Sequence, residues 1–238
     1  MNESELRKRW DSGILEARTR VAAAARDAGR DSAAITLIAV SKHQPFAAIQ
    51  YLYRQHGQRD FGENYAQELR GKALEAEASG LRDIRWHFIG QLQTNKVKFV
   101  APHLTAIHTI DSLRLAEMLS KKICQSERAS VPLDCFIEVN LDAQATKAGI
   151  VPTVDAVVEL WQHMSKLPGL KPIGLMAIPD PNASDRPFER LARLASDAGT
   201  TITAPSLSIG MSADFGAAIT AGSTHVRIGT TIFGPRPA

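Results

Sequence analysis

The stretch Ile35-Thr-Leu-Ile-Ala-Val-Ser-Lys42 indicates how this chain folds. Its first six residues, five of them aliphatic, carry no charge, and Gln44-Pro45 closes the run. A short apolar run that ends near a proline is typical of a fully buried strand in a parallel sheet. Lys42 then lies at the carboxyl end of a strand, where open α/β sheets and (β/α)8 barrels place their functional residues.

A lysine at this position has two interpretations. An ammonium group held against apolar neighbours loses hydration, which favours the free amine, a nucleophile toward carbonyl groups. Lys42 is therefore a candidate Schiff-base lysine. The alternative is a surface lysine that begins a loop, because lysines often end strands.

The rest of the chain repeats the alternation of strand and helix. Seven further segments have strand character: 60–64, 85–89, 105–110, 133–140, 171–176, 206–209 and 224–228. Segments with helix character separate them, and one of these begins at Gly90 and contains residues 91–96. Eight strand signals without a Gly/Ser-rich linker predict a single (β/α)8 barrel over residues 1–238. A doubly wound open sheet is the alternative, but it leaves a short eighth strand at an edge.

The N-terminal segment predicts an additional helix ahead of the first strand. Between Ser4 and Ala28, apolar residues recur at intervals of three and four, and Gly29 follows as a stop signal. We expect residues 1–30 to pack on the barrel as an N-terminal helix.

Composition excludes several classes of protein. The hydrophobic content of 44% and the net charge of +3 are ordinary for a globular protein and too mild to indicate a nucleic-acid partner. Cys124 and Cys135 form neither a disulfide framework nor a metal spacing, which favours a reducing compartment. The charged N-terminus does not resemble a signal peptide, and no apolar run could span a membrane. We expect a cytoplasmic, monomeric protein without a metal site.

Two loops near the C-terminus suggest a phosphate site. Leu207-Ser-Ile-Gly-Met-Ser-Ala-Asp214 reads as a strand, a glycine and then a helix whose first turn carries Ser212 and Asp214. Val226-Arg-Ile-Gly-Thr-Thr-Ile-Phe-Gly234 is a second strand that runs into a glycine. Backbone N–H groups at a helix start bind phosphate, and Ser208 and Ser212 could add hydroxyl donors. In barrels the loops after strands seven and eight commonly form such a site, although glycine after a strand is also ordinary turn chemistry.

A phosphate site and an amine at one mouth suggest a phosphorylated aldehyde, with pyridoxal 5'-phosphate (PLP) as the obvious candidate. Gly210, Met211, Gly229 and Thr230 would then hold the phosphate. Arg227 precedes Gly229 by two residues and would project into the same mouth. A guanidinium can only donate, so beside the ring nitrogen it would leave that nitrogen unprotonated and the ring a poor electron sink. A salt bridge at the barrel rim is the alternative for Arg227.

Several motifs together resemble the pyridoxal phosphate homeostasis protein family, which is similar to the barrel domain of alanine racemase. They lie in order between Ile35 and Arg236: residues 39–42, 61–65, 86–90, 93–96, 174–176, 207–214, 226–230 and 232–234. The resemblance implies a one-domain barrel with PLP on Lys42, Arg227 near the ring nitrogen, and phosphate contacts from 208–211 and 229–230. Departures are small: His43 follows the lysine, Gln91 stands where His is frequent, and Ile209 stands where Met is frequent.

The resemblance also implies four residues that line the mouth: Asn64, His87, Asn140 and Met176. Two of them have simpler interpretations. His87 lies on an apolar strand, where a hydrogen-bonded core histidine is the usual finding. Asn64 could cap the following helix.

The resemblance implies a PLP carrier and regulator, which keeps the free aldehyde low and influences amino-acid and keto-acid balance. PLP-dependent client enzymes are the partners expected for this role. Racemases of this barrel type draw a second base, a tyrosine, from an additional domain, and we expect none in a chain that ends at Ala238. The tyrosines Tyr51, Tyr53 and Tyr65 are not obvious substitutes. The main hypothesis is therefore a carrier without robust turnover. Two alternatives remain: a small racemase, and a binding module in which Lys42 has no functional role.

Overall fold

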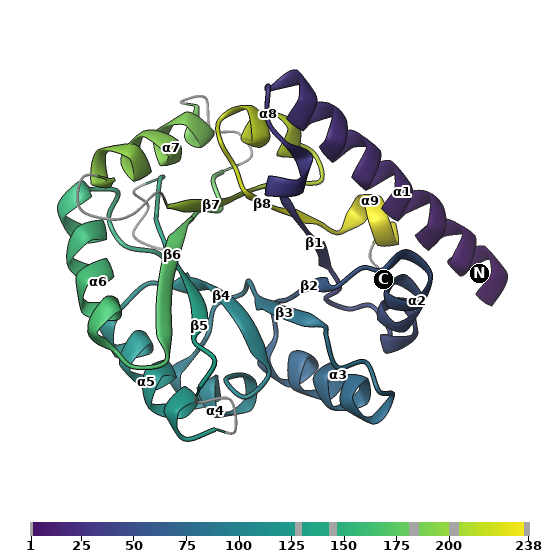
Figure 1. Ribbon diagram of the computed structural model, residues 1–238, viewed down its shortest axis with the longest axis horizontal. Coiled ribbons are helices and arrows are strands. Elements are labelled where there is room, and N and C mark those ends of the chain that lie inside the picture. Colours follow the sequence, from purple (N-terminus) through teal and green to yellow (C-terminus); the bar gives the residue numbers. More distant parts are fainter. Residues whose placement is uncertain (1, 127–129, 143–146, 181–185, 200–204, 236–238) are drawn as a thin grey trace.

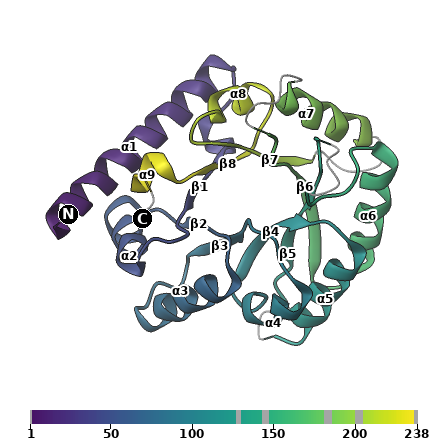
Figure 2. The ribbon, with the colours of Figure 1, turned by 180° about the vertical axis from the view of Figure 1, so that it is seen from behind.

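The strands of the computed structural model close into one barrel in which every neighbouring pair is parallel and the order follows the sequence (Figures 1 and 2). The structure describes residues 2–126, 130–142, 147–180, 186–199 and 205–235. The strands are β1 (Thr36–Val40), β2 (Asp60–Glu63), β3 (Arg85–Phe88), β4 (Leu104–Ile110), β5 (Leu133–Glu138), β6 (Leu170–Met176), β7 (Ser206–Met211) and β8 (His225–Ile228).

Helices form the outer layer around this barrel. They are α1 (Glu3–Asp27), α2 (Phe46–His56), α3 (Ala66–Ala78), α4 (Val97–Val100), α5 (Leu113–Cys124), α6 (Val154–Lys166), α7 (Pro187–Ala198), α8 (Phe215–Thr220) and α9 (Thr230–Phe233). Two 3-10 turns, η1 (Ser32–Ala34) and η2 (Thr94–Lys96), precede β1 and α4. The predicted (β/α)8 barrel is confirmed, and the open-sheet alternative is wrong because β1 pairs with both β2 and β8.

The N-terminal helix α1 is present as predicted and lies across α8 and α9 (Figure 1). An Asn2 capping box begins it, and its buried face includes Trp10, Ile14 and Val21. A Cβ atom at Gly13 would lie 2.5 Å from the carbonyl oxygens of Thr231 and Ile232. Only glycine therefore allows α1 to approach α9 this closely.

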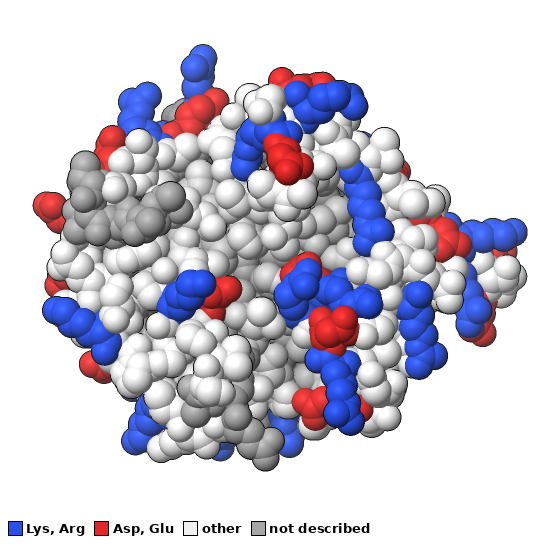
Figure 3. Space-filling view, viewed as in Figure 1, with Lys and Arg blue, Asp and Glu red and all other residues white. Residues whose placement is uncertain are grey.

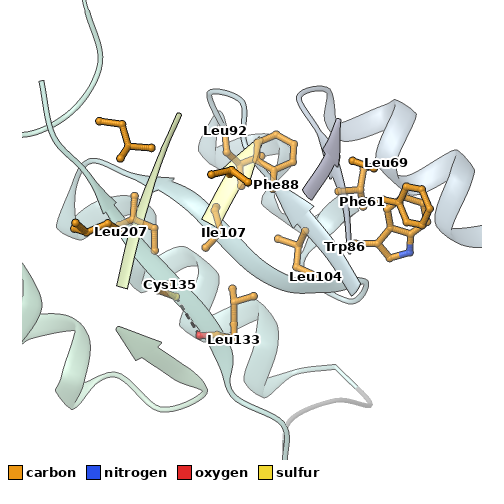
Figure 4. Close-up of a cluster of buried hydrophobic side chains, with 14 of the residues drawn as sticks. Phe61, Leu69, Trp86, Phe88, Leu92, Leu104, Ile107, Leu133, Cys135 and Leu207 are labelled. Carbon is orange, nitrogen blue, oxygen red and sulfur yellow. Dashed lines mark hydrogen bonds between the residues drawn. The ribbon is translucent and has the colours of Figure 1, made fainter. Parts of the chain in front are cut away.

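The apolar core lies between the strands and the helices. Phe61 and Trp86 point outward from β2 and β3, their ring centroids 6.1 Å apart, and lie beside Leu69 of α3 (Figure 4). Successive side chains of a strand point to opposite faces of the sheet. The apolar residues that face the helices therefore alternate with residues that point into the barrel. The interior is unusually polar, because barrels of this type are mostly filled by Val, Ile and Leu. Polar residues among its described side chains include Asp60, His87, His108, Ser208, His225 and Arg227.

Two predicted segments differ in detail. The helix expected from Gly90 is an extended segment followed by η2 and the short α4. Strand β7 continues to Met211, and α8 begins only at Phe215, so Ser212 and Asp214 precede the helix instead of forming its first turn. Asp214 takes the N-cap position, and its Oδ1 accepts a hydrogen bond from the Met211 N–H at 2.6 Å.

Charged side chains of both signs are interspersed on the face of the barrel seen in Figure 3. Among the residues that the structure describes, no helix combines the length and the apolar character that crossing a bilayer requires.

Candidate functional site

One cavity lies beside the carboxyl ends of β1, β2, β7 and β8, with a volume of about 290 Å³. This is near the lower end of the range for small-molecule sites. Six of the predicted site residues line it: Lys42, Asn64, Met211, Arg227, Gly229 and Thr230. Val40, Ile89, Ile178 and Phe233 contribute apolar wall, and Gln44, Ser212, Ala213 and Gly234 complete the lining. The fold thus brings the candidate lysine, the arginine and the last glycine loop to one place.

The lysine side of the cavity is held by an outer network, which consists of Ser41, Glu63, Glu68 and Lys72. Its members meet between the barrel and α3. Lys72 of α3 donates from Nζ to the Ser41 carbonyl oxygen and to Glu63 Oε1, both at 2.7 Å, and to Glu68 Oε1 at 2.8 Å. The Ser41 hydroxyl also donates to Glu63 Oε1, at 2.7 Å. The residue before Lys42 is therefore held through both its backbone and its side chain.

Glu63 is the most deeply buried carboxylate of the outer network, with a side chain that is 0% exposed. Burial raises its pKa to about 6, although Lys72 and the Ser41 hydroxyl act in the opposite direction. Its Oε2 atom has no hydrogen-bond partner in the described part of the chain. Glu63 is therefore a buried acid that changes charge just below neutral pH.

The arginine side of the cavity is formed by Arg227, which is buried at the carboxyl end of β8, the strand next to β1. Its Nη1 donates to the carbonyl oxygen and to Oγ of Ser208, each at 2.8 Å, and its Nη2 donates to the Ala177 carbonyl oxygen at 3.0 Å. Burial lowers its pKa to about 10, which Asp214 and Glu138 partly oppose, so the guanidinium stays charged at neutral pH. These three acceptors are neutral oxygens, and they fix the direction in which the guanidinium points.

An interior chain of hydrogen bonds leads from Arg227 through the barrel to its other end. It consists of Arg227, Ser208, His108, His87, Asp60 and Arg85. Ser208 Oγ lies 2.8 Å from His108 Nδ1, and His108 Nε2 lies 3.0 Å from His87 Nδ1. His87 Nε2 lies 3.0 Å from Asp60 Oδ1, and Arg85 donates to both oxygens of Asp60.

The two ends of this chain fix the direction of the hydrogen bonds that they make. Burial, with His87 and His225 nearby, lowers the pKa of His108 well below its ordinary value, so its ring is neutral. Arg227 can only donate, so Ser208 Oγ accepts from it, and the neutral His108 ring accepts at one nitrogen and donates at the other. At the other end, the ionised Asp60 can only accept, so His87 donates to it from Nε2.

The loops predicted to hold an anion lie at the cavity, with different internal contacts. Ser212 lines it, and its Oγ accepts from the Gly229 N–H at 3.2 Å. The Met211 N–H is already bonded to Asp214. The first N–H groups of a helix have no partner within that helix, and in α9 these belong to Thr230 and Thr231. Backbone donors at 230–231 and at the 212–213 turn are therefore the candidates for an anion.

Other predicted residues do not line the cavity. Gly210 has a positive φ, and a Cβ there would lie 2.6 Å from that of Ala218, so the glycine allows α8 to pack on β7. Ser208 and His87 belong to the interior chain, where both ring nitrogens of His87 are hydrogen bonded, as in a core histidine. Met176 is fully buried at the end of β6.

Two asparagines were predicted at the mouth. Asn64 lines the cavity, and its Oδ1 is buried without a hydrogen-bond partner among the described residues. A Cβ at Gly90 would lie 2.3 Å from the Asn64 carbonyl oxygen, so glycine is required beside it. Asn140 does not line the cavity and donates from its side chain to the Lys147 carbonyl oxygen.

Sequence reasoning missed the residues that support the site. Lys72 follows Glu68 by four residues, the spacing of an ion pair on one helix face, and this was the available signal. Asp60 and His108 are polar residues beside apolar ones in their strands, and this alternation was the signal that they face inward. Within the described residues, no group of three or more His, Cys, Asp or Glu side chains could hold a metal ion.

Fold and cavity together define the class of protein: a parallel (β/α)8 barrel with a lysine at the mouth of its first strand. The family model of the alanine racemase N-terminal domain matches residues 18–237. The chain is also 41% identical over 227 residues to the pyridoxal phosphate homeostasis protein of Pseudomonas aeruginosa, covering 94% of each chain. The chain belongs to the pyridoxal phosphate homeostasis protein family, within the wider group of alanine racemase N-terminal barrels.

Solved structures agree with this assignment. PipY of Synechococcus elongatus, in a structure with PLP bound, is 32% identical, with a TM-score of 0.74 and coverage of 84% of this chain and 93% of that one. Alanine racemase from Oenococcus oeni is 16% identical, with a TM-score of 0.65, and shows the shared fold alone. The matched region covers 95% of the present chain but only 57% of that racemase.

Proposed function

We propose that this protein binds PLP as a Schiff base on Lys42. The Lys42 amine condenses with the aldehyde carbon of PLP and releases water. Arg227 donates to the ring nitrogen, and backbone N–H groups of Thr230, Thr231 and the 212–213 turn hold the phosphate, with Gly229 in the cavity wall beside them. Of the remaining predicted residues, Asn64 and Met211 contact the ligand from the cavity wall. The others support the wall without contacting the ligand: Ser208, Gly210, His87 and Met176.

The observation that carries this proposal is the convergence of Lys42, Arg227 and the 229–230 loop on one cavity. The donor set suits PLP: an amine for the aldehyde, N–H groups for the phosphate and a permanent cation for the ring nitrogen. The unpaired Oδ1 of Asn64 supplies an additional polar contact that a ligand could satisfy. The PLP in the related PipY supports the same choice of ligand.

We further propose that the protein is a carrier and regulator of PLP without robust turnover. A guanidinium beside the ring nitrogen leaves the ring unprotonated and weakens it as an electron sink. Of the tyrosines, Tyr65 is half exposed and does not line the cavity, so no second base faces Lys42 from this group. The proposal places the protein in the cytoplasm as a monomer that serves PLP-dependent client enzymes.

The first experiment compares absorbance spectra of the purified wild type, Lys42→Ala and Lys121→Ala with added PLP, before and after borohydride reduction. Lys121 is an exposed lysine of α5 and serves as the matched control. We expect a visible band in the wild type and in Lys121→Ala, and a reduced pyridoxyl adduct on Lys42 by mass spectrometry.

Loss of the band in Lys42→Ala alone supports the proposal, whereas a wild type that takes up no PLP contradicts it. Exchange of the α-proton of an amino acid in deuterated water at enzymatic rates would instead identify a small racemase.

A further inference from the structure

Lys72 is a buried charge that does not line the cavity. Its side chain is 6% exposed, and it lies on the face of α3 that packs on the barrel. A buried ion pair is often no more stabilising than apolar residues of the same volume. The position of Lys72 therefore needs an explanation beyond stability.

The hydrogen bonds of the outer network converge on the two residues that flank Lys42. On the N-terminal side, Lys72 contacts the Ser41 carbonyl oxygen, and Glu63 accepts from the Ser41 hydroxyl. On the C-terminal side, Glu68 Oε1 accepts from the His43 N–H at 2.6 Å. The same Glu68 oxygen accepts from Lys72, so one ammonium group ties both flanks together.

The backbone at this turn needs such support. His43 has a φ of 62°, a left-handed conformation that residues with a side chain rarely adopt. Ser41 points toward α3, whereas Lys42 lines the cavity. Fixing Ser41 and His43 therefore fixes the direction in which the Lys42 side chain leaves the backbone.

We propose that Lys72, acting through Glu63 and Glu68, is a positioning residue that aims the Lys42 amine into the cavity. The inference rests on the proposed function, because it concerns how Lys42 meets PLP. Lys72 itself touches neither the ligand nor the reacting atoms.

The test uses the full-length variants Lys72→Met, Lys72→Arg and Glu68→Gln. Glu75→Gln is the matched control, because Glu75 is an exposed acid on the same helix. Two quantities are measured with added PLP: the rate at which the visible band forms, and the visible circular dichroism per bound PLP. The second reports how firmly the ring is oriented, which a merely stabilising residue would not change.

We expect Lys72→Met to form the band about tenfold more slowly and with weaker circular dichroism, because a small misplacement of a reacting group costs rate. Lys72→Arg should recover most of both, since arginine keeps the charge and the donors. Glu68→Gln should fall in between, and Glu75→Gln should match the wild type.

A folded Lys72→Met with the wild-type rate and circular dichroism overturns the inference. If Lys72→Met does not fold, the same two measurements on Glu68→Gln replace it. Wild-type values for that variant then overturn the inference. If the wild type itself forms no adduct on Lys42, the proposed function fails, and the inference with it. If the wild type forms the adduct and the variants match it, only the inference fails.

Discussion

The lysine side and the arginine side of the cavity are built by different means. On the lysine side, charged groups of the outer network hold the residues that flank Lys42: the buried Lys72 and Glu63 and the partly exposed Glu68. On the arginine side, carbonyl and hydroxyl oxygens orient Arg227, and the neutral imidazole of His108 continues the interior chain. The nearest ionised acid of that chain, Asp60, lies at its far end.

This difference in surroundings matches the chemistry of the lysine amine and of the arginine guanidinium. A guanidinium stays charged whatever surrounds it, so neutral acceptors are enough to orient it. A lysine amine can lose its proton, so charges next to its backbone influence both its direction and its chemistry. The two sides should therefore respond differently to pH and to substitution.

The largest effect is expected at the far end of the interior chain. Burial disfavours ionised Asp60, but hydrogen bonds from Arg85 and His87 outweigh it and lower its pKa to about 2. The stability that Asp60 contributes is thus complete above about pH 4 and lost as the pH falls through about 2. We expect Asp60→Asn to lower the free energy of unfolding by about 3 kcal/mol at pH 7.

Urea unfolding at several pH values checks this. The deficit of Asp60→Asn relative to the wild type should shrink by about 2 kcal/mol toward pH 2. Asp197→Asn, an exposed acid on α7, is the control. A deficit that does not vary with pH would show that Asp60 is not the ionised end of the chain.

The second effect has the opposite sign, on the lysine side. Because burial raises the pKa of Glu63 to about 6, the folded protein binds this proton more tightly than the unfolded chain does. Ionised Glu63 therefore reduces stability above about pH 6, and the wild type recovers about 2 kcal/mol as the pH falls from about 6 to about 4.5.

Glu63→Gln should lack this recovery, whereas Glu75→Gln should retain it. The measurement is the free energy of unfolding between pH 7 and pH 4.5. Parallel curves for the wild type and Glu63→Gln would contradict a titrating outer network and remove the contrast between the two sides.

The smallest effect concerns the turn after Lys42. His43→Gly relieves the cost of the left-handed backbone but gives the unfolded chain more freedom, so the two changes nearly cancel. We expect the free energy of unfolding to change by less than about 1 kcal/mol. A loss above about 2 kcal/mol in urea unfolding would instead assign a structural role to the His43 ring, whose centroid lies 5.1 Å from that of Tyr65.

The site was predictable where chemistry and chain position coincide. Lys42 and Arg227 are polar residues at the ends of apolar strands, and in a closed parallel barrel such ends share one mouth. Gly229 and Thr230 follow a strand directly and lie at the cavity for the same reason. Ser208 and His87 are polar residues in apolar strands, and the alternation of a strand does not tell which level of the barrel they occupy.

The sequence by itself determined the (β/α)8 barrel, its N-terminal helix and the family, because strand and helix periods and short motifs are local properties of the chain. Only the tertiary structure decided that Lys72 and Glu68 hold the turn around Lys42, and that four residues join Arg227 to Arg85 through the barrel. The physical reason is that these contacts join residues far apart in the chain, at distances that closure of the barrel sets. A hydrogen bond depends on those distances to within a few tenths of an ångström.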